Sequence, residues 1–418
     1  MRKKALLGLA GVALAALAVG GGFVLWREHE SRNVHGSPTE EFVTTAAPKP
    51  RPKPVALQIP WPMYGYDPAR RRAPGGMHVR PPYRPIWGFR AGHLVEFPPA
   101  VAYSLLFFAN GKGTLYAVRS GRGLLVWSYH AGRCTAASPA VDGETVYMTF
   151  MNKPPCNTTR SGIDGLLVAF DAFTGKVRWR RTIGPSETSP AVENGVVYVG
   201  DWRNKVYAFT ASTGRLRWVF TSDGKVKGGI AYSGGHVYFG TYGHHVYALR
   251  AVNGKQIWRA SAQQRLGSSA TFYSTPAVAY GRVYIGGTDG KVYSFGATSG
   301  KLRWSHGTGG YVYSSPAVWQ KRVYVGSFDH NLYCFDAATG DVVWSFKAND
   351  QISGSPVVVD GIVYFSSLGQ RTYGLDARSG KLLWSFPQGK YAGVVSDGKR
   401  AYLTGYGRVI GLKERKAR

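Results

Sequence analysis

A chain of 418 residues that is 44% hydrophobic and contains 55 glycines can bury a large core and would ordinarily fold as more than one domain. The 52 Lys and Arg residues against 23 Asp and Glu give a net charge of +29, which favours anionic partners or serves only solubility. Three cysteines without a CxxC pair argue against cysteine-based metal or redox chemistry.

The first predicted element is a membrane segment. Residues 5–26 carry no charge, and as a helix they would be roughly 33 Å long, enough to cross a bilayer core. A signal peptide cleaved near Ala18 is the other interpretation, but the apolar run continues well past that residue and favours a retained anchor over 1–27. Basic residues at 2–4 predict a single-pass cell-membrane protein with a cytoplasmic N-terminus and an extracytoplasmic domain.

A linker and an extension are expected next. Residues 28–60 are polar and then proline-rich, and the alternation of Pro with Lys or Arg over 47–54 is typical of an extended polyproline II spacer. The interpretation is that this spacer holds the following domain away from the membrane. Residues 61–84 are expected to form an N-terminal extension that lies over a domain spanning 85–418.

That domain is organised by a repeated motif, seen in the stretch from Ala169 to Trp179. A small residue is followed after six positions by a glycine and after ten by a tryptophan, and seven copies recur about every 40 residues, typical of a repeat array. The glycines are Gly123, Gly175, Gly214, Gly254, Gly300, Gly340 and Gly380. The tryptophans are Trp127, Trp179, Trp218, Trp258, Trp304, Trp344 and Trp384.

Each unit reads as four short strands separated by turns, in the sixth unit over 314–318, 322–326, 331–335 and 342–346. The last unit lacks its tryptophan strand, and an unpaired strand of that kind lies around Trp87. The N-terminal strand is therefore expected to complete the last unit and close the ring. The sequence predicts an all-β, eight-bladed propeller of four-stranded blades.

The motif spacing has a structural explanation. The glycine allows a tight turn before the fourth strand, often with positive φ. The tryptophan can then lay its apolar face over an adjacent blade while its N–H finds an acceptor. We expect the eight tryptophans, including Trp87, and the seven glycines to dock the blades together.

This motif resembles the tryptophan-docked repeat of the pyrroloquinoline-quinone-type (PQQ-like) eight-bladed propellers, from about Trp61 to Leu412. That family includes quinoprotein alcohol dehydrogenases and non-catalytic envelope proteins. In overall layout the chain resembles the BamB-type propeller of the outer-membrane β-barrel assembly machinery, which implies a scaffold without a cofactor. The chain differs from that type in having a predicted membrane helix and a strong positive charge.

The residues expected of a quinone enzyme cannot be matched: the sequence has no adjacent cysteines, and the repeated acidic residues fall where they would bond turn amides. No catalytic residue, cofactor or metal is therefore predicted. The histidines at 244, 245 and 330 are expected to be exposed turn residues, because no third ligand has suitable spacing.

The three cysteines have separate expectations. Cys134 follows the first tryptophan strand and Cys156 lies in an insertion whose connection emerges on the same face of the propeller. In an oxidising compartment a disulfide between them would pin that insertion. Cys334 occupies the small-residue position of its repeat and should be a buried free thiol.

The same face collects basic and aromatic residues, which together suit a protein or polyanion partner. They are Arg133, Lys153, Arg160, Trp202, Arg203, Lys205, Lys225, Lys227, Tyr242, Arg265, Tyr311, Tyr313, Phe328, Arg371, Tyr406 and Arg408. The opposite face is also basic through its Gly-Lys turns. The main hypothesis is a monomeric, non-catalytic protein-interaction scaffold of the cell envelope, which does not bind nucleic acid. The alternatives are a binder of anionic wall polymer or membrane surface, and a PQQ-dependent dehydrogenase.

Overall fold

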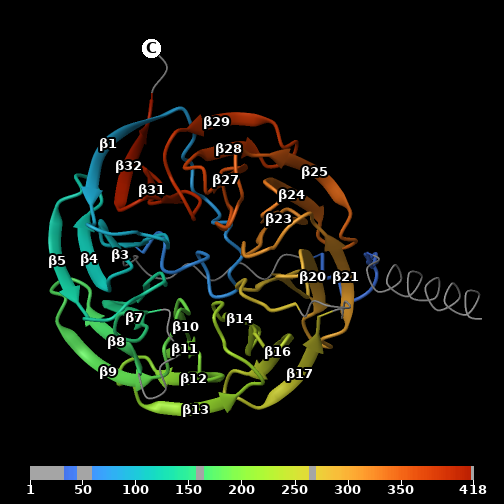
Figure 1. Ribbon diagram of the computed structural model, residues 1–418, viewed down its shortest axis with the longest axis horizontal. Coiled ribbons are helices and arrows are strands. Elements are labelled where there is room, and N and C mark those ends of the chain that lie inside the picture. The colour runs from blue at the N-terminus through green and yellow to red at the C-terminus, as the bar shows by residue number, and fades with distance from the viewer. Residues whose placement is uncertain (1–32, 45–58, 157–163, 263–269, 416–418) are drawn as a thin grey trace, which may run out of the picture.

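The structure is a computed structural model that describes residues 33–44, 59–156, 164–262 and 270–415. Eight four-stranded antiparallel sheets stand as blades around a central axis, with the outer strands forming the rim (Figure 1). The all-β, eight-bladed propeller predicted from the repeat is confirmed. The predicted membrane segment at 5–26 lies outside these ranges, and within them no helix is long and apolar enough to span a bilayer.

The first seven blades follow one another along the chain, each running from the axis to the rim. Blade 1 consists of β2 (Ala100–Ala102), β3 (Leu105–Ala109), β4 (Thr114–Arg119) and β5 (Leu125–His130), and blade 2 of β6 (Ala140–Asp142), β7 (Thr145–Phe150), β8 (Gly165–Asp171) and β9 (Val177–Ile183). Blade 3 consists of β10 (Ala191–Glu193), β11 (Val196–Gly200), β12 (Lys205–Thr210) and β13 (Leu216–Thr221), and blade 4 of β14 (Ala231–Ser233), β15 (His236–Gly240), β16 (His245–Arg250) and β17 (Gln256–Ser261). Blade 5 consists of β18 (Ala277–Ala279), β19 (Arg282–Gly286), β20 (Lys291–Gly296) and β21 (Leu302–Gly307). Blade 6 consists of β22 (Ala317–Trp319), β23 (Arg322–Gly326), β24 (Asn331–Asp336) and β25 (Val342–Lys347). Blade 7 consists of β26 (Val357–Val359), β27 (Ile362–Ser366), β28 (Thr372–Asp376) and β29 (Leu382–Phe386).

The eighth blade combines the two ends of the domain. It consists of β30 (Val395–Ser396), β31 (Ala401–Gly405), β32 (Arg408–Glu414) and, as its outer strand, β1 (Tyr83–Arg90). β1 pairs antiparallel with β32, with Trp87 opposite Gly411. β1 begins two residues before the expected domain boundary at 85. The pairing leaves the ring without an unpaired blade, which removes sheet edges that could pair with other chains.

The first strands are shorter than the sequence suggested. In the sixth blade β22 begins at Ala317, not at residue 314. The amide of Ser315 instead donates to Oγ of Ser355 in the next blade, at 2.9 Å, so this residue links blades and does not extend the strand. The second strands are almost fully buried, whereas outer strands such as β9 bury mainly their tryptophan and alternate with exposed residues.

The repeated glycine and tryptophan meet between neighbouring blades. The indole Nε1 of Trp127 donates to the carbonyl of Ala172 at 2.9 Å, and Gly175 has φ +69°. A Cβ atom at Gly175 would lie 2.6 Å from Cδ2 of Trp127. The glycine therefore both makes the turn and leaves room for the preceding blade's indole. The same indole-to-carbonyl bond is made by Trp87, Trp179, Trp218, Trp258, Trp304 and Trp344.

The junction between the seventh and eighth blades is built differently. Trp384 packs edge-on against Tyr83 of β1, with ring centroids 5.2 Å apart. The hydroxyl of Tyr83 also donates to the carbonyl of Val79 at 2.9 Å. The N-terminal strand thus supplies an aromatic ring where the last blade lacks the motif glycine.

We name the two faces of the propeller by their connections. The loop face carries the turns between second and third strands and the connections from each fourth strand to the next blade. The turn face carries the turns between first and second strands and between third and fourth strands. The Gly-containing motif turns belong to the turn face, and those predicted partner residues that the structure describes belong to the loop face.

The N-terminal extension closes the axis from the turn face. The sequence had led us to expect that it lies over the domain. Trp61 exchanges main-chain hydrogen bonds with Val101 of the first blade, at 3.1 and 2.7 Å. Later residues of the extension accept main-chain hydrogen bonds from the first strands of five further blades, at Val141, Tyr232, Val278, Val318 and Val358. At the centre, buried Arg70 donates to the carbonyls of Ile230, Ser189 and Pro190 at 2.8 to 3.0 Å. The extension is therefore a plug held by the inner strands.

Part of the expected spacer over 28–60 lies against the propeller. Within it, residues 33–44 pack along the outer edge of the fifth blade, where Val34 forms a β-bridge with Ser305. Residues 59 and 60 already lead into the plug at the first blade. The spacer interpretation does not hold for 33–44, because this part pairs with unpaired backbone groups of the outer strand β21.

Candidate functional site

The loop face brings the predicted partner residues together around the open end of the axis. Trp202, Tyr242, Phe328, Arg371 and Tyr406 lie in or beside turns between second and third strands. Arg133, Tyr311 and Tyr313 lie in connections between blades. Arg160 and Arg265 lie outside the described residues.

The aromatic residues of the loop face form a continuous path from the axis towards the rim. Tyr273 at the axis contacts Tyr313 with ring centroids 5.3 Å apart, and Tyr313 contacts Phe328 at 5.0 Å. Tyr311 follows at 6.0 Å from Tyr313, and its side chain is 55% exposed. We call these four residues the aromatic path. An exposed tyrosine at its outer end is available to a partner.

A groove of about 450 Å³ lies beside the outer end of the aromatic path. Tyr311 and Phe328 line it together with Gly309, Gly310 and Asp289. The hydroxyl of Tyr293 donates a hydrogen bond to the carboxylate of Asp289, which restrains this side chain. The groove is large enough to receive one or two side chains of a partner protein.

A much smaller cavity, about 40 Å³, lies on the axis itself. Its floor is built from the repeated Ser-Pro segments, whose hydroxyls join neighbouring blades: the amide of Thr275 donates to Oγ of Ser315 at 3.0 Å. The plug contributes Tyr64, whose hydroxyl lies 2.9 Å from Oγ of Ser355. The cavity is therefore a closed-ended mouth and not a channel through the propeller.

Charged groups line this mouth beside Tyr273. Nζ of Lys227 lies 3.5 Å from Oε1 of the buried Glu187 and 4.6 Å from the ring centre of Trp202. Burial raises the pKa of Glu187, and the positive charge of Lys227 opposes that shift. Lys227 thus compensates one buried carboxylate and also makes a cation–π contact.

Glu96 is the second carboxylate of the mouth. Burial raises its pKa to about 7, and the negative charge of Glu187 adds to the shift. In the described ranges no ion pair involves Glu96. Of the two carboxyl groups of the mouth, Glu187 is therefore paired with Lys227, whereas Glu96 is not.

The repeat pattern did not reveal this mouth. Glu96, Glu187 and Tyr273 occur in connections of irregular sequence, and single acidic residues there carry no motif. The serine that recurs in the Ser-Pro segments was the available sequence signal for this mouth. A polar residue that recurs close to the axis must find a hydrogen-bond partner there. Arg70 gave no signal, because the neighbouring sequence is basic throughout.

The mouth does not fit the quinone cofactor of a PQQ-dependent dehydrogenase. Its volume is far below the 300 to 1,000 Å³ typical of ligand sites. The described residues contain no group of three His, Cys, Asp or Glu side chains that could hold a metal ion. His245 instead contacts the carboxylate of Asp223 and the carbonyl of Gly243, and His244 the carbonyl of Ala270.

The cysteines occupy two environments. Cys134 and Cys156 form a disulfide with their Cα atoms 5.8 Å apart, which ties the second blade's insertion to the connection after the first blade. Cys334 is a fully buried free thiol. Burial raises its pKa to about 12, so the reactive thiolate is scarce.

Curated relatives align with part of the chain. The outer membrane protein assembly factor BamB of Salmonella typhimurium is 26% identical over 212 residues, 48% of this chain and 49% of the relative. BamB of Bordetella pertussis is 30% identical over 158 residues, 37% of this chain and 36% of the relative. A tetrathionate hydrolase of Acidithiobacillus ferrooxidans is 28% identical over 164 residues, 35% of this chain and 32% of the relative. The matches thus span between about a third and a half of these relatives.

Solved structures share the fold. BamB from Moraxella catarrhalis aligns with a TM-score of 0.65 at 17% identity, covering 79% of this chain and all of that one. A quinohemoprotein alcohol dehydrogenase from Pseudomonas putida aligns with a TM-score of 0.71 at 14% identity, covering 86% of this chain and 82% of that one. At such identities the similarity establishes the propeller architecture and no activity.

The family model described as outer membrane protein assembly factor BamB matches residues 83–189, 163–311 and 306–416, nearly the whole propeller. The resemblance expected from the tryptophan repeat is thereby confirmed, and the chain belongs to this BamB-type family of PQQ-like repeat propellers.

Proposed function

We propose that this chain is a membrane-anchored, extracytoplasmic propeller that binds other proteins as a non-catalytic scaffold of the cell envelope. The observation that carries the proposal is the chemistry of the loop-face groove of about 450 Å³, which lies beside the exposed Tyr311 at the outer end of the aromatic path. The turn face has a groove of similar volume, about 440 Å³, but Arg80 and Asp360 in its lining already pair with each other. The family relationship to assembly factors supports the same reading.

The groove and the aromatic path have the chemistry of a protein-binding site. Tyrosines contribute large contact areas at low entropic cost and are enriched among residues that dominate binding energy. Main-chain groups of Gly309 and Gly310 line the groove together with the rings of Tyr311 and Phe328. A partner side chain placed there would bury apolar surface and could also form hydrogen bonds with polar backbone groups.

The surrounding charge favours a partner with an acidic rim. In the described part of the chain, Lys205 and Arg371 form no ion pair, unlike Arg203, which lies 2.8 Å from Asp164. Unpaired basic side chains around an aromatic centre would increase the association rate of an acidic protein. We propose that the propeller acts as a monomer and that residues 5–26 place it on the outer side of the cell membrane.

Binding of an anionic wall polymer or lipid surface is the second candidate, favoured by the net charge of +29. Its retention on such a polymer would fall steeply between low and high salt, because screening shortens electrostatic interactions. A PQQ-dependent dehydrogenase is disfavoured by the small axial mouth. Titration with the quinone and calcium, followed by absorbance and dye-linked alcohol oxidation, would reveal saturable cofactor binding with turnover if that reading were correct.

The scaffold proposal is tested by comparing two aromatic substitutions during purification from detergent-solubilised native membranes. Tyr311→Ala on the loop face is expected to lower the yield of a specific co-purifying protein at least fivefold. Phe173→Ala is the matched control, because Phe173 is a 45% exposed aromatic residue of a turn-face motif. Equal yields for both variants, or loss only with Phe173→Ala, would contradict the proposed site.

A further inference from the structure

Residues 33–44 form a strap along the outer edge of the fifth blade. Val34 and Ser305 of β21 exchange main-chain hydrogen bonds at 3.2 and 3.1 Å, and the bridge is antiparallel. The amide of Gly36 donates to the carbonyl of Thr339 in the sixth blade at 2.9 Å. The strap therefore joins two neighbouring blades from outside.

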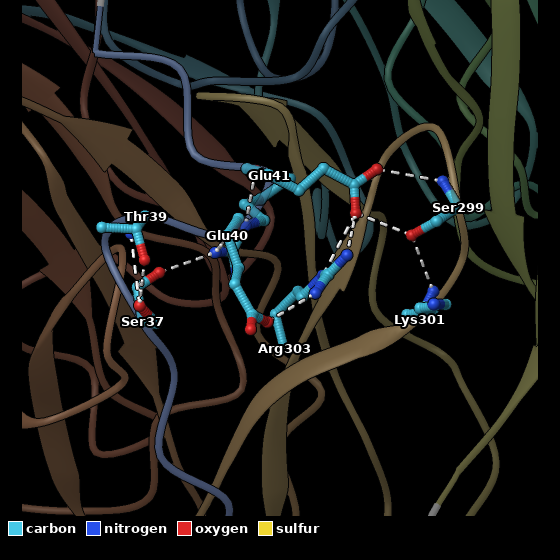
Figure 2. Close-up of polar contacts among 8 residues, drawn as sticks. Ser37, Thr39, Glu40, Glu41, Ser299, Lys301 and Arg303 are labelled. Atoms are coloured by element: carbon cyan, nitrogen blue, oxygen red, sulfur yellow. Dashed lines mark hydrogen bonds and ion pairs between the residues drawn. The ribbon is translucent and has the colours of Figure 1, made fainter.

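Glu41 anchors the far end of the strap, and Figure 2 shows its side chain directed at the turn that contains Ser299. Its carboxylate accepts hydrogen bonds from the amide of Ser299 at 3.0 Å, from Oγ of Ser299 at 2.6 Å and from Nε of Arg303 at 3.1 Å. Buried Arg282 donates to the carbonyl of Glu41 at 2.8 Å. These charge-assisted hydrogen bonds show that the strap is specifically bound to the fifth blade and does not merely lie on its surface.

The fit of the strap is tight. A Cβ atom at Gly36 would lie 2.2 Å from the carbonyl oxygen of Ala338, so only glycine can occupy this position without displacement. The strap also covers Trp304, which is fully buried, whereas Trp127 remains 9% exposed. The groove between the fifth and sixth blades is thus shaped for this segment.

The direction of the strap distinguishes the two faces of the propeller. The amide of Gly307 donates to Oδ1 of Asn33 at 3.0 Å, and Gly307 pairs with Lys291 at the loop-face end of the blade. Eight residues later Glu41 lies at the turn-face motif turn, and Phe42 packs on Tyr280 with ring centroids 5.3 Å apart. The chain therefore comes onto the propeller at the loop-face end of β21 and leaves it at the turn face.

The distance between the strap and the predicted membrane segment is short. Only residues 27–32 separate the apolar run from Asn33, and six residues span at most about 20 Å. The proline-rich residues 47–54 follow the strap and so add nothing to this distance. If the anchor proposed above is retained, the loop-face end of β21 must lie within that distance of the bilayer.

We infer that the strap turns the loop face, with its fifth and sixth blades foremost, towards the membrane, so that the groove beside Tyr311 receives the bilayer-proximal part of a membrane-embedded protein. Tyr311 follows Gly307, where the strap begins, by only four residues. An anionic lipid headgroup is a poorer occupant of the groove, because Asp289 is among the residues that line it. This inference rests on the proposed membrane attachment and adds the orientation and the kind of partner.

The orientation can be measured on the full-length chain in phospholipid vesicles that contain a headgroup nitroxide quencher. Fluorophores are attached in separate proteins at Arg371→Cys on the loop face and Lys301→Cys on the turn face. Both positions are exposed, whereas Cys334 is buried and the other two cysteines are paired. We expect at least twofold stronger quenching at position 371 than at 301, in neutral and in anionic vesicles alike.

The strap is tested by Gly36→Ala, which would clash with Ala338 and should reduce the difference in quenching to less than half. Gly75→Ala is the matched control, because no atom lies within 4 Å of a Cβ there. Equal quenching of both faces, stronger quenching at 301, or a difference seen only with anionic lipid would overturn the inference. Failure of the chain to float with vesicles would instead refute membrane attachment, so the two failures are distinguishable.

Partner contact is measured in the same vesicles after co-reconstitution with the solubilised native membrane proteins, using a photo-crosslinker at Phe328. An adduct with a bilayer-embedded protein supports the proposed occupant. Adducts only with phospholipid, or only with a soluble protein, would contradict it.

Discussion

Gly340 of the sixth blade packs directly against the indole ring of Trp304 of the fifth blade. A Cβ atom at Gly340 would approach Cδ2 of Trp304 to 2.6 Å, and the backbone there has φ +81°. The ring in turn donates to the carbonyl of Ala337 at 3.0 Å. One glycine therefore serves both the turn of its own blade and the seat of the preceding blade's tryptophan.

Substitution of this glycine should weaken the junction between blades. We expect Gly340→Ala to lower the free energy of unfolding by roughly 2 to 4 kcal/mol, from the positive φ and the overlap with the ring together. Gly143→Ala is the control, because Gly143 also has positive φ, +51°, but no atom within 4 Å of a Cβ. Chemical denaturation of both variants separates the two contributions, and equal losses would contradict the docking role.

The plug depends on its buried arginine. Arg70→Met would leave the carbonyls of Ile230, Ser189 and Pro190 without their donor, at an expected cost of about 3 kcal/mol or more. Arg71→Met should cost less than about 1 kcal/mol, because Arg71 pairs with Asp67 at the surface. Thermal unfolding and protease cleavage within the extension would show the difference. Unchanged cleavage in Arg70→Met would mean that main-chain bonds alone hold the plug.

The axial mouth predicts a dependence of stability on pH. Burial and Glu187 raise the pKa of Glu96 from 4.5 to about 7, so the folded protein holds a proton there that the unfolded chain has released. Stability contributed by this proton is complete below about pH 4.5 and is lost as the pH rises through 7. Glu96→Gln should therefore be more stable than the native chain by roughly 1 to 3 kcal/mol at pH 8.

At pH 4.5 that advantage should almost disappear, since the Glu96 carboxyl is then protonated in the folded state and half protonated in the unfolded state. Unfolding curves of the two proteins between pH 4.5 and 8 provide the measurement. An advantage that is constant over this range would show that the substitution acts through packing and not through charge.

The thiol count distinguishes the cysteines. The native chain should show no thiol that reacts within minutes at pH 8, because Cys334 is buried with its pKa raised to about 12. Denaturation without reductant should release one thiol, and reduction should release three. Cys134→Ser should make Cys156 reactive, because Cys156 is partly exposed whereas Cys134 is buried. Three thiols on denaturation alone would exclude the disulfide.

The architecture could be predicted from the sequence because every blade uses the same short motif. The glycine and the tryptophan of each motif must keep their spacing for the indole to reach the next blade, and that spacing is visible in one sequence. The missing strand at the end and the Trp87 strand at the beginning also pointed to the observed pairing of β1 with β32.

The axial mouth and the strap could not be predicted in the same way. Glu187 and Lys227 meet only because their two connections converge at the axis, and no spacing along the chain encodes that convergence. In the sequence the strap has the composition of a polar linker. Glu41 can be recognised as its anchor only from the structure, where Ser299 and Arg303 lie beside it. Contacts formed once, between distant segments, leave no repeat to detect.

The most direct test of the scaffold account is site-specific photo-crosslinking in the native membrane. A photoreactive residue is placed at Tyr311 on the loop face or, as the control, at Val252, which is 78% exposed in a turn-face motif turn. The account predicts a discrete adduct with one protein at position 311, with little or none at 252. No adduct at 311, or the same adducts at both positions, would contradict protein binding through the loop face.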